Sequence, residues 1–278
     1  MAKVKIGQVG AISVIMLVGG LVVLVASVFY GSSTLALIGL GLTFWGALLL
    51  YIRPEGYTRK ELLNAVILPS LATLNEMIQE LNYRGEALYL PPRYFVNPES
   101  TRVYIAKQKV ATLPMPELIQ KYETQLFVKN PEGLLLMPPG AELANIFEKK
   151  LGINFTRVDL EYLQRNMPRL FIEDLEIAGN LEMEILPKTI PTGTPAVSLL
   201  QAERYAVQVR ITDPICREIC GGSNRLEYIC DRIGCPIYSS IGCALTKATG
   251  DPVMIESVRT LEDGKTVEVI YGILGVES

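Results

Sequence analysis

The chain contains no histidine, and this absence removes several classes of active site. Histidine is the usual base beside a serine or cysteine nucleophile, and it is a common ligand of zinc and of haem iron. Acid–base chemistry would therefore fall to aspartate, glutamate, lysine, tyrosine or cysteine. Positive charge is also scarce, because 26 Lys and Arg against 29 Asp and Glu give a formal net charge of -3. The sequence has no basic cluster, so we expect no nucleic-acid partner.

Charged side chains are missing altogether from residues 6–52, where only a short turn at 30–34 breaks the apolar sequence. The two apolar runs, over about 10–30 and 35–52, have nearly the ~20 residues that a hydrocarbon core requires. Basic side chains flank the runs, and the connecting turn has none. The sequence therefore predicts a transmembrane helical hairpin over residues 1–56. We expect a multi-pass protein of the cell membrane, in contact with the lipid bilayer and with both termini in the cytoplasm.

Residues 57–278 alternate between helix and strand patterns, which predicts a cytoplasmic α+β domain. From Thr58 to Leu81, apolar residues recur every three or four positions, which indicates an amphipathic helix that Pro69 kinks or divides. Its apolar face could cover the domain's own sheet, pair with a second copy in a homo-oligomer, or lie on the bilayer.

Runs of apolar residues predict strands along the rest of this segment. The expected strands are 86–90, 102–107, 133–137, 181–186 and 204–211. Two more alternating runs, joined at Asp263 and Gly264, predict a terminal hairpin. A helix is expected between Pro139 and Gly152. The Pro-, Thr- and Gly-rich residues 187–195 indicate a boundary between two sub-domains.

Five cysteines lie in the C-terminal part of the chain, and no two have the C-x-x-C spacing of zinc ribbons and many iron–sulfur sites. A metal or cluster site of irregular spacing stays open, with Cys216, Cys220, Cys235 and Cys243 as its ligands. In a reducing compartment we expect no structural disulfides. Cys230 falls on the apolar side of a predicted helix, which indicates a core residue.

Gly234 and Pro236 predict the end of one helix and the start of the next, which places Cys235 at the N-cap. Backbone N–H groups and the helix dipole stabilise a thiolate there, so Cys235 is the candidate reactive thiol. Along the helix that follows, small side chains gather on the face opposite a bulky stripe. They are Ser239, Gly242, Cys243 and Thr246. We expect this face to contact a helix or strand backbone, a ligand, or a partner chain.

Several stretches together resemble an uncharacterised family of archaeal membrane-anchored proteins. They are the two apolar runs, "GLLLMPPGAEL", and "CPIYSSIGCALTKATGDPVMIE" followed by "DGKTVEV". The resemblance implies an archaeal, cytosol-facing setting, and it implies no activity or cofactor. The final part of the chain also resembles, in the order of its elements, the ligand-binding 4-vinyl reductase domain. That family ends with further cysteines and histidine, which the terminal hairpin here lacks.

These patterns predict a membrane-tethered cytoplasmic module that responds to a ligand or acts as a scaffold, with no evident catalytic activity and an unknown cofactor. Two alternatives stay open. One is a cysteine-dependent protein that binds a metal or carries out redox chemistry. The other is an accessory subunit of a larger membrane complex, because the short hairpin has no polar group that would line a transport path.

Overall fold

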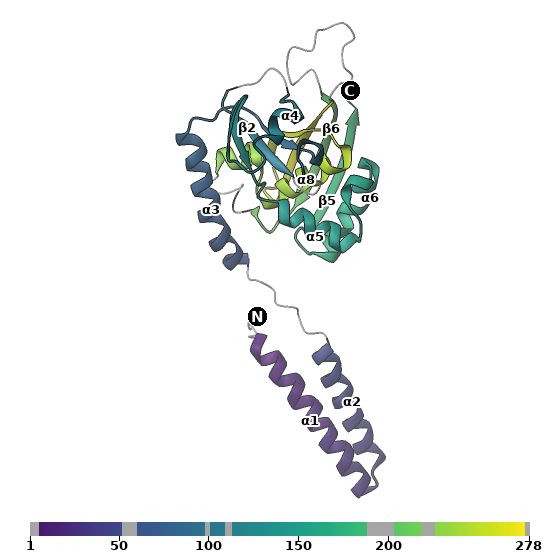
Figure 1. Cartoon of the computed structure of the whole chain (residues 1–278). Helices are drawn as coiled ribbons and strands as arrows, with labels where there is room; N and C mark the ends of the chain where they lie inside the picture. Colours follow the sequence, from purple (N-terminus) through teal and green to yellow (C-terminus); the bar gives the residue numbers. More distant parts are fainter. Residues whose placement is uncertain are drawn as a thin grey trace. The chain divides into compact units, whose positions relative to one another are not determined.

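The structure is a computed structural model of the chain, shown in Figure 1. Its described residues form two compact units, divided between Arg59 and Lys60. The first unit is a pair of helices, and the second is an α+β domain. The described residues are 6–51, 60–97, 101–108, 113–187, 203–217, 219 and 226–275.

The first unit consists of α1 (Ile6–Tyr30) and α2 (Ser33–Tyr51), which pack against each other. Glycine allows the two helices to approach closely. A Cβ atom added at Gly20 would lie 2.6 Å from the backbone nitrogen of Thr43, which is too short for any real contact. The absence of a side chain at Gly20 therefore lets the backbones of α1 and α2 come close together.

The transmembrane hairpin expected from this region is not supported. A membrane-spanning helix needs about 20 consecutive apolar residues. Within the parts of α1 and α2 whose side chains the structure describes, 14–30 and 33–49, no helix combines that length with that apolar character. The predictions that depend on the hairpin are corrected with it: the membrane-spanning part of the fold class, the multi-pass location in the cell membrane, and the cytoplasmic placement of the termini.

The second unit is built on an antiparallel sheet, with eight strands among the described residues in the order β3-β4-β2-β1-β7-β8-β6-β5. Every described pairing in it is antiparallel. The strands are β1 (Ala87–Leu90), β2 (Arg102–Ala106), β3 (Phe127–Lys129), β4 (Glu132–Leu136), β5 (Asn180–Pro187), β6 (Glu203–Thr212), β7 (Val253–Thr260) and β8 (Thr266–Leu274).

Helices and short helical turns surround this sheet (Figure 1). The α-helices are α3 (Lys60–Glu80), α4 (Pro116–Gln120), α5 (Ala141–Leu151), α6 (Leu160–Arg169) and α8 (Pro236–Thr249). The shorter turns are η1 (Pro92–Tyr94), η2 (Phe155–Arg157), η3 (Leu170–Asp174) and η5 (Ile229–Ile233).

Two apolar cores form because successive strand residues point to opposite faces of the sheet. In β2, Val103 belongs to the larger core, which contains buried residues of α3, α5, α6 and α8. Its neighbour Tyr104 belongs to the smaller core, together with Leu135 of β4 and Ile119 of α4. The sheet therefore has α8 and α5 on one face, and the start of β2 lies close to both.

The α+β class of this unit agrees with the sequence-based prediction. Leu71 and Ile78 of α3 are buried in the larger core, so the amphipathic face covers the domain's own interior. Pro69 lies inside α3 without ending it. The short strand β3 was not predicted. Of the expected sub-domain boundary, only Pro187 lies within the described residues.

Candidate functional site

Helix α8 is the element from which the candidate site is built. It begins where the sequence indicates, with Cys235 at the N-cap and Pro236 in the first turn, and it ends at Gly250, whose φ of 67° is left-handed. Every residue from Ile237 to Lys247 is buried. A helix that is buried all round must fit against its neighbours on every side, so its small residues decide what approaches it.

Three of the four residues on the predicted small-residue face of α8 contact backbone or side chains of the same domain. The backbone N–H of Gly140 donates a hydrogen bond to Ser239 Oγ over 3.1 Å. A Cβ atom at Gly242 would lie 2.9 Å from Cζ of Tyr89, so the absence of a side chain makes room for the aromatic ring. The hydroxyl of Thr246 donates to the backbone oxygen of Tyr89 over 3.1 Å. This face of α8 therefore receives β1 and the loop before α5.

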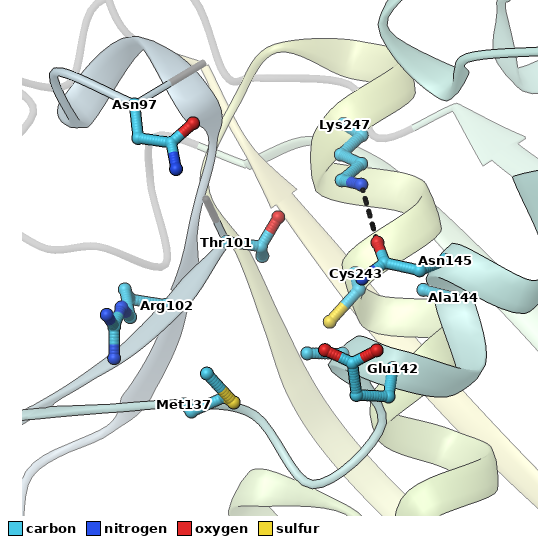
Figure 2. A pocket seen from close by; sticks show the side chains of 10 residues that line it. Asn97, Thr101, Arg102, Met137, Glu142, Ala144, Asn145, Cys243 and Lys247 are labelled. Atoms are coloured by element: carbon cyan, nitrogen blue, oxygen red, sulfur yellow. Dashed lines mark hydrogen bonds between the residues drawn. The ribbon is translucent and has the colours of Figure 1, made fainter. Parts of the chain in front are cut away.

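The fourth small residue, Cys243, lines a cavity of about 200 Å³ instead. The cavity lies between the region around the start of β2 and the helices α5 and α8 (Figure 2). Its lining residues are Asn97, Thr101, Arg102, Met137, Ala141, Glu142, Ala144, Asn145, Cys243 and Lys247. Because Asn97, Met137 and Glu142 are exposed, the cavity opens to the surface at that rim.

Thr101, just before β2, has its hydroxyl in the wall of the cavity. Only 8% of the residue is exposed, and Oγ1 has no hydrogen-bond partner among the described residues. Figure 2 shows the hydroxyl directed across the cavity toward the side formed by α8. A buried hydroxyl without a partner costs about 1 to 3 kcal/mol, so proteins seldom keep one without a reason.

Lys247 of α8 supplies a charge on the opposite wall. Its side chain is 5% exposed, and Nζ lies 2.9 Å from Oε2 of Glu148. The amide oxygen of Asn145 accepts a second, longer hydrogen bond from Nζ at 3.4 Å. Glu148 is itself held by the backbone N–H of Phe155, which donates to Oε1 over 2.7 Å. The ammonium group is therefore fixed in position between α8 and α5.

The first turn of α5 contributes Ala141, Glu142 and Ala144 to the same cavity. The N-cap residue, Gly140, offers no side-chain hydrogen bond to the N–H groups of this turn. No larger residue fits there, because a Cβ atom would lie 2.1 Å from the backbone nitrogen of Ser240. The N-terminal end of α5, where the helix dipole is positive, thus lies beside the cavity without a side-chain cap, and the N–H of Ala141 donates to the backbone oxygen of Pro138 over 3.0 Å.

Burial makes Cys243 a neutral thiol at physiological pH. Desolvation raises its pKa to about 12, although nearby Lys247 acts in the opposite direction. A thiol in this state is a small, weakly polar group and a poor nucleophile. Cys243 therefore contributes shape to the cavity and no negative charge.

The candidate reactive thiol, Cys235, is 1% exposed and packs in the larger core. It forms a hydrogen bond with Cys216, which together with burial raises the pKa of Cys216. Cys230 donates a hydrogen bond from Sγ to the backbone oxygen of Ile219 over 3.4 Å, as suits a core residue. The structure thus brings two of the expected thiols together on the core side of the α8 N-terminus.

The proposed four-thiol metal site is only partly visible, because Cys220 lies outside the described residues. Among the other three, Cys243 lies two helical turns along α8 from Cys235. Over the described ranges, no group of three or more His, Cys, Asp or Glu residues is arranged to hold a metal ion.

Sequence reasoning identified Cys243 and missed Thr101, Asn145 and Lys247. Lys247 follows Cys243 by four positions, so both lie on one face of α8, and a lysine on that face was a usable signal. Thr101 and Asn145 carry no such signal in the sequence, because only the folded chain brings the start of β2 beside α5.

Comparison with known proteins identifies a family. The family model described as "Domain of unknown function (DUF7982)" matches residues 2–271. No curated protein and no solved structure matched the chain. The comparisons agree with a family to which no function is assigned, and they provide no support for an archaeal origin or for a likeness to 4-vinyl reductases.

Proposed function

The chain belongs to the DUF7982 family, and because the description of that family assigns no function, we propose from the cavity that the second unit is a ligand-responsive binding module. The observation that carries the proposal is the buried Thr101 hydroxyl, which has no partner among the described residues and faces a cavity of about 200 Å³. Because this oxygen is closed to water in the structure, a ligand group reaches it with a small shift of the neighbouring side chains, and it then satisfies the hydroxyl and removes its desolvation cost. Such pairing of an apolar wall with a few directed polar groups is typical of binding sites.

The walls of the cavity explain how a ligand would affect the domain. One wall is the start of β2, and the other consists of α5 and α8, which the Lys247–Glu148 ion pair joins. A ligand that contacts both walls adds bonds between elements far apart in sequence. Binding therefore stabilises the domain in proportion to ligand concentration and affinity.

The side chains of the cavity favour binding over nucleophilic catalysis. Cys243 is kept protonated by burial, and Lys247 is engaged by Glu148.

The cysteine-dependent alternative has less to support it. The four described thiols are all buried and none forms a disulfide. Within the described part of the chain, no cluster of ligands suits a metal.

The test is thermal unfolding of the full chain in the presence of a collection of small polar metabolites. We expect some compounds to raise the Tm of the wild-type protein and to leave unchanged the Tm of Ala141→Phe, in which the new ring fills the cavity mouth. Met137→Trp, at a position 58% exposed, is a second blocked variant that leaves the core intact. If no compound raises the Tm, or if the shifts are equal in the wild type and both variants, the proposal is wrong.

A further inference from the structure

We infer that the ligand of this cavity is a small organic carboxylate, whose head group lies against Thr101, Lys247 and the first turn of α5. The inference rests on the proposed binding function and adds the chemical class of the ligand. It is carried by the polar groups that line the cavity, by the end of the helix that faces it, and by the apolar part of its wall.

Most of the polar side chains that line the cavity can donate a hydrogen bond. The donors are Asn97, Thr101, Arg102, Asn145, Cys243 and Lys247. The one lining side chain that only accepts is Glu142, which is exposed at the rim. Asn97, Thr101 and Asn145 can also accept, but Arg102 and Lys247 can only donate, and these two charged donors favour a ligand with acceptor oxygens.

The charges point in the same direction. Lys247 Nζ donates to Glu148 and Asn145 and keeps one further N–H for a ligand. Arg102 also lines the cavity, with its guanidinium turned away from α5 and α8 in Figure 2. The N–H of Ala141 already donates to the backbone oxygen of Pro138 over 3.0 Å, so the positive end of the α5 dipole favours an anion at the N–H groups that follow it. Independently of the helix, the buried Thr101 hydroxyl has no described partner and is aimed into the same space (Figure 2).

The rest of the wall indicates that the anion carries a short apolar body. Ala141, Ala144 and the methionine side chain of Met137 line the cavity together with the neutral thiol of Cys243. A cavity of about 200 Å³ is larger than an inorganic oxyanion alone needs. A carboxylate with a few carbon atoms would satisfy the donors and also remove apolar surface from water.

The experiment is isothermal titration calorimetry on the full chain with four probes: butyrate, 1-butanol, butylamine and inorganic phosphate. The first three share a four-carbon chain and differ in the charge of the head group, while phosphate has the oxyanion without the chain. We expect butyrate to bind and each of the others to bind at least about tenfold more weakly, because each lacks either the charge-assisted hydrogen bonds or the apolar contact.

Matched variants test where the head group lies. Thr101→Val keeps the shape of the side chain and removes its hydroxyl, so it should weaken butyrate binding about tenfold. Glu142→Gln removes the negative charge at the rim and should tighten binding by about threefold. The control is Glu161→Gln, since Glu161 is likewise an acidic residue in the first turn of a helix, α6, and does not line the cavity. It should leave the affinity unchanged.

The outcomes separate this inference from the proposed function. If 1-butanol or butylamine binds as well as butyrate, or if phosphate binds and butyrate does not, the carboxylate class is wrong while a ligand site remains. Equal affinities of Thr101→Val and the wild type would also overturn the inference. A collection of metabolites that includes no binder would overturn the proposed function itself.

Discussion

Lys247 Nζ lies 2.9 Å from Glu148 Oε2, and this ion pair joins α8 to α5 beside the cavity. The two side chains are only 5% and 15% exposed. A pair removed from water to this extent is stable only with further hydrogen bonds, which Asn145 and the backbone of Phe155 provide. The pair therefore sets both the geometry of the cavity wall and part of the stability of the domain.

Removal of one partner of this pair should destabilise the fold. In Lys247→Met the carboxylate of Glu148 stays partly buried without its cation, so the free energy of unfolding should fall by about 3 kcal/mol. Urea denaturation followed by circular dichroism measures the change. The control is Arg169→Met, which breaks the Arg169–Glu173 pair, whose side chains are 73% and 67% exposed. Exposed pairs contribute little, and an equal loss in the two variants would contradict the importance of burial.

Gly242 should tolerate no side chain, because the ring of Tyr89 occupies the space where one would be. A Cβ atom there would lie 2.9 Å from the ring, so Gly242→Ala should lower the free energy of unfolding by about 1 to 3 kcal/mol. Gly179→Ala is the matched control, since its Cβ would meet Thr212 at an ordinary 3.4 Å. Equal midpoints of denaturation for Gly242→Ala and the wild type would show that α8 and β1 are not packed in this way.

The buried thiol of Cys243 should make stability depend on pH in the alkaline range. Burial raises its pKa from 9.0 to about 12, so the folded state holds the proton more tightly than the unfolded state. The stabilisation that the folded state gains from holding this proton is complete below pH 9.0 and is lost as the pH rises toward 12.

The measurement for Cys243 is a comparison of slopes. Above pH 9.0 the free energy of unfolding of the wild type should fall more steeply than that of Cys243→Ala, by up to about 1.4 kcal/mol per pH unit. Burial also raises the pKa values of Tyr89 and Tyr271, and Cys243 adds to both shifts, so the difference in slope measures Cys243 together with its effect on these two tyrosines. Parallel slopes would mean that the thiol is accessible to water in the folded protein.

Alkylation should distinguish packed thiols from a reactive one. Cys216, Cys230, Cys235 and Cys243 are all buried, so iodoacetamide should modify them much more slowly in the native protein than in urea. Mass spectrometry of the peptides gives the rate at each position. Rapid native modification of Cys235 would instead support the reactive N-cap thiol predicted from the sequence.

Local sequence signals predicted α8 well, because its boundaries depend on nearby residues. Gly234 has a φ of 80° and Gly250 a φ of 67°, which glycine adopts without strain, and Pro236 fits the first turn of the helix. The terminal hairpin was equally clear from the Asp263–Gly264 turn. By contrast, β3 has three residues, and at that length alternation carries no signal.

Other features depend on contacts that the sequence does not display. Long apolar runs in the first unit led to a membrane hairpin that the described residues do not support. The cavity combines Thr101, Asn145 and Lys247 from three separate segments, so no local motif reveals it. Cys243 was identified because its helical periodicity was visible, whereas its role in a cavity wall was not.

The most direct test measures the free energy of unfolding of the wild type and Thr101→Val, each without and with a fixed concentration of butyrate. Without butyrate, Thr101→Val should be at least as stable as the wild type, because the lost hydroxyl had no partner among the described residues. With butyrate, the wild type should gain more stability than the variant. A loss of stability in Thr101→Val without butyrate would show that the hydroxyl serves the fold. Equal gains of stability with butyrate would show that the cavity does not bind a carboxylate through this hydroxyl.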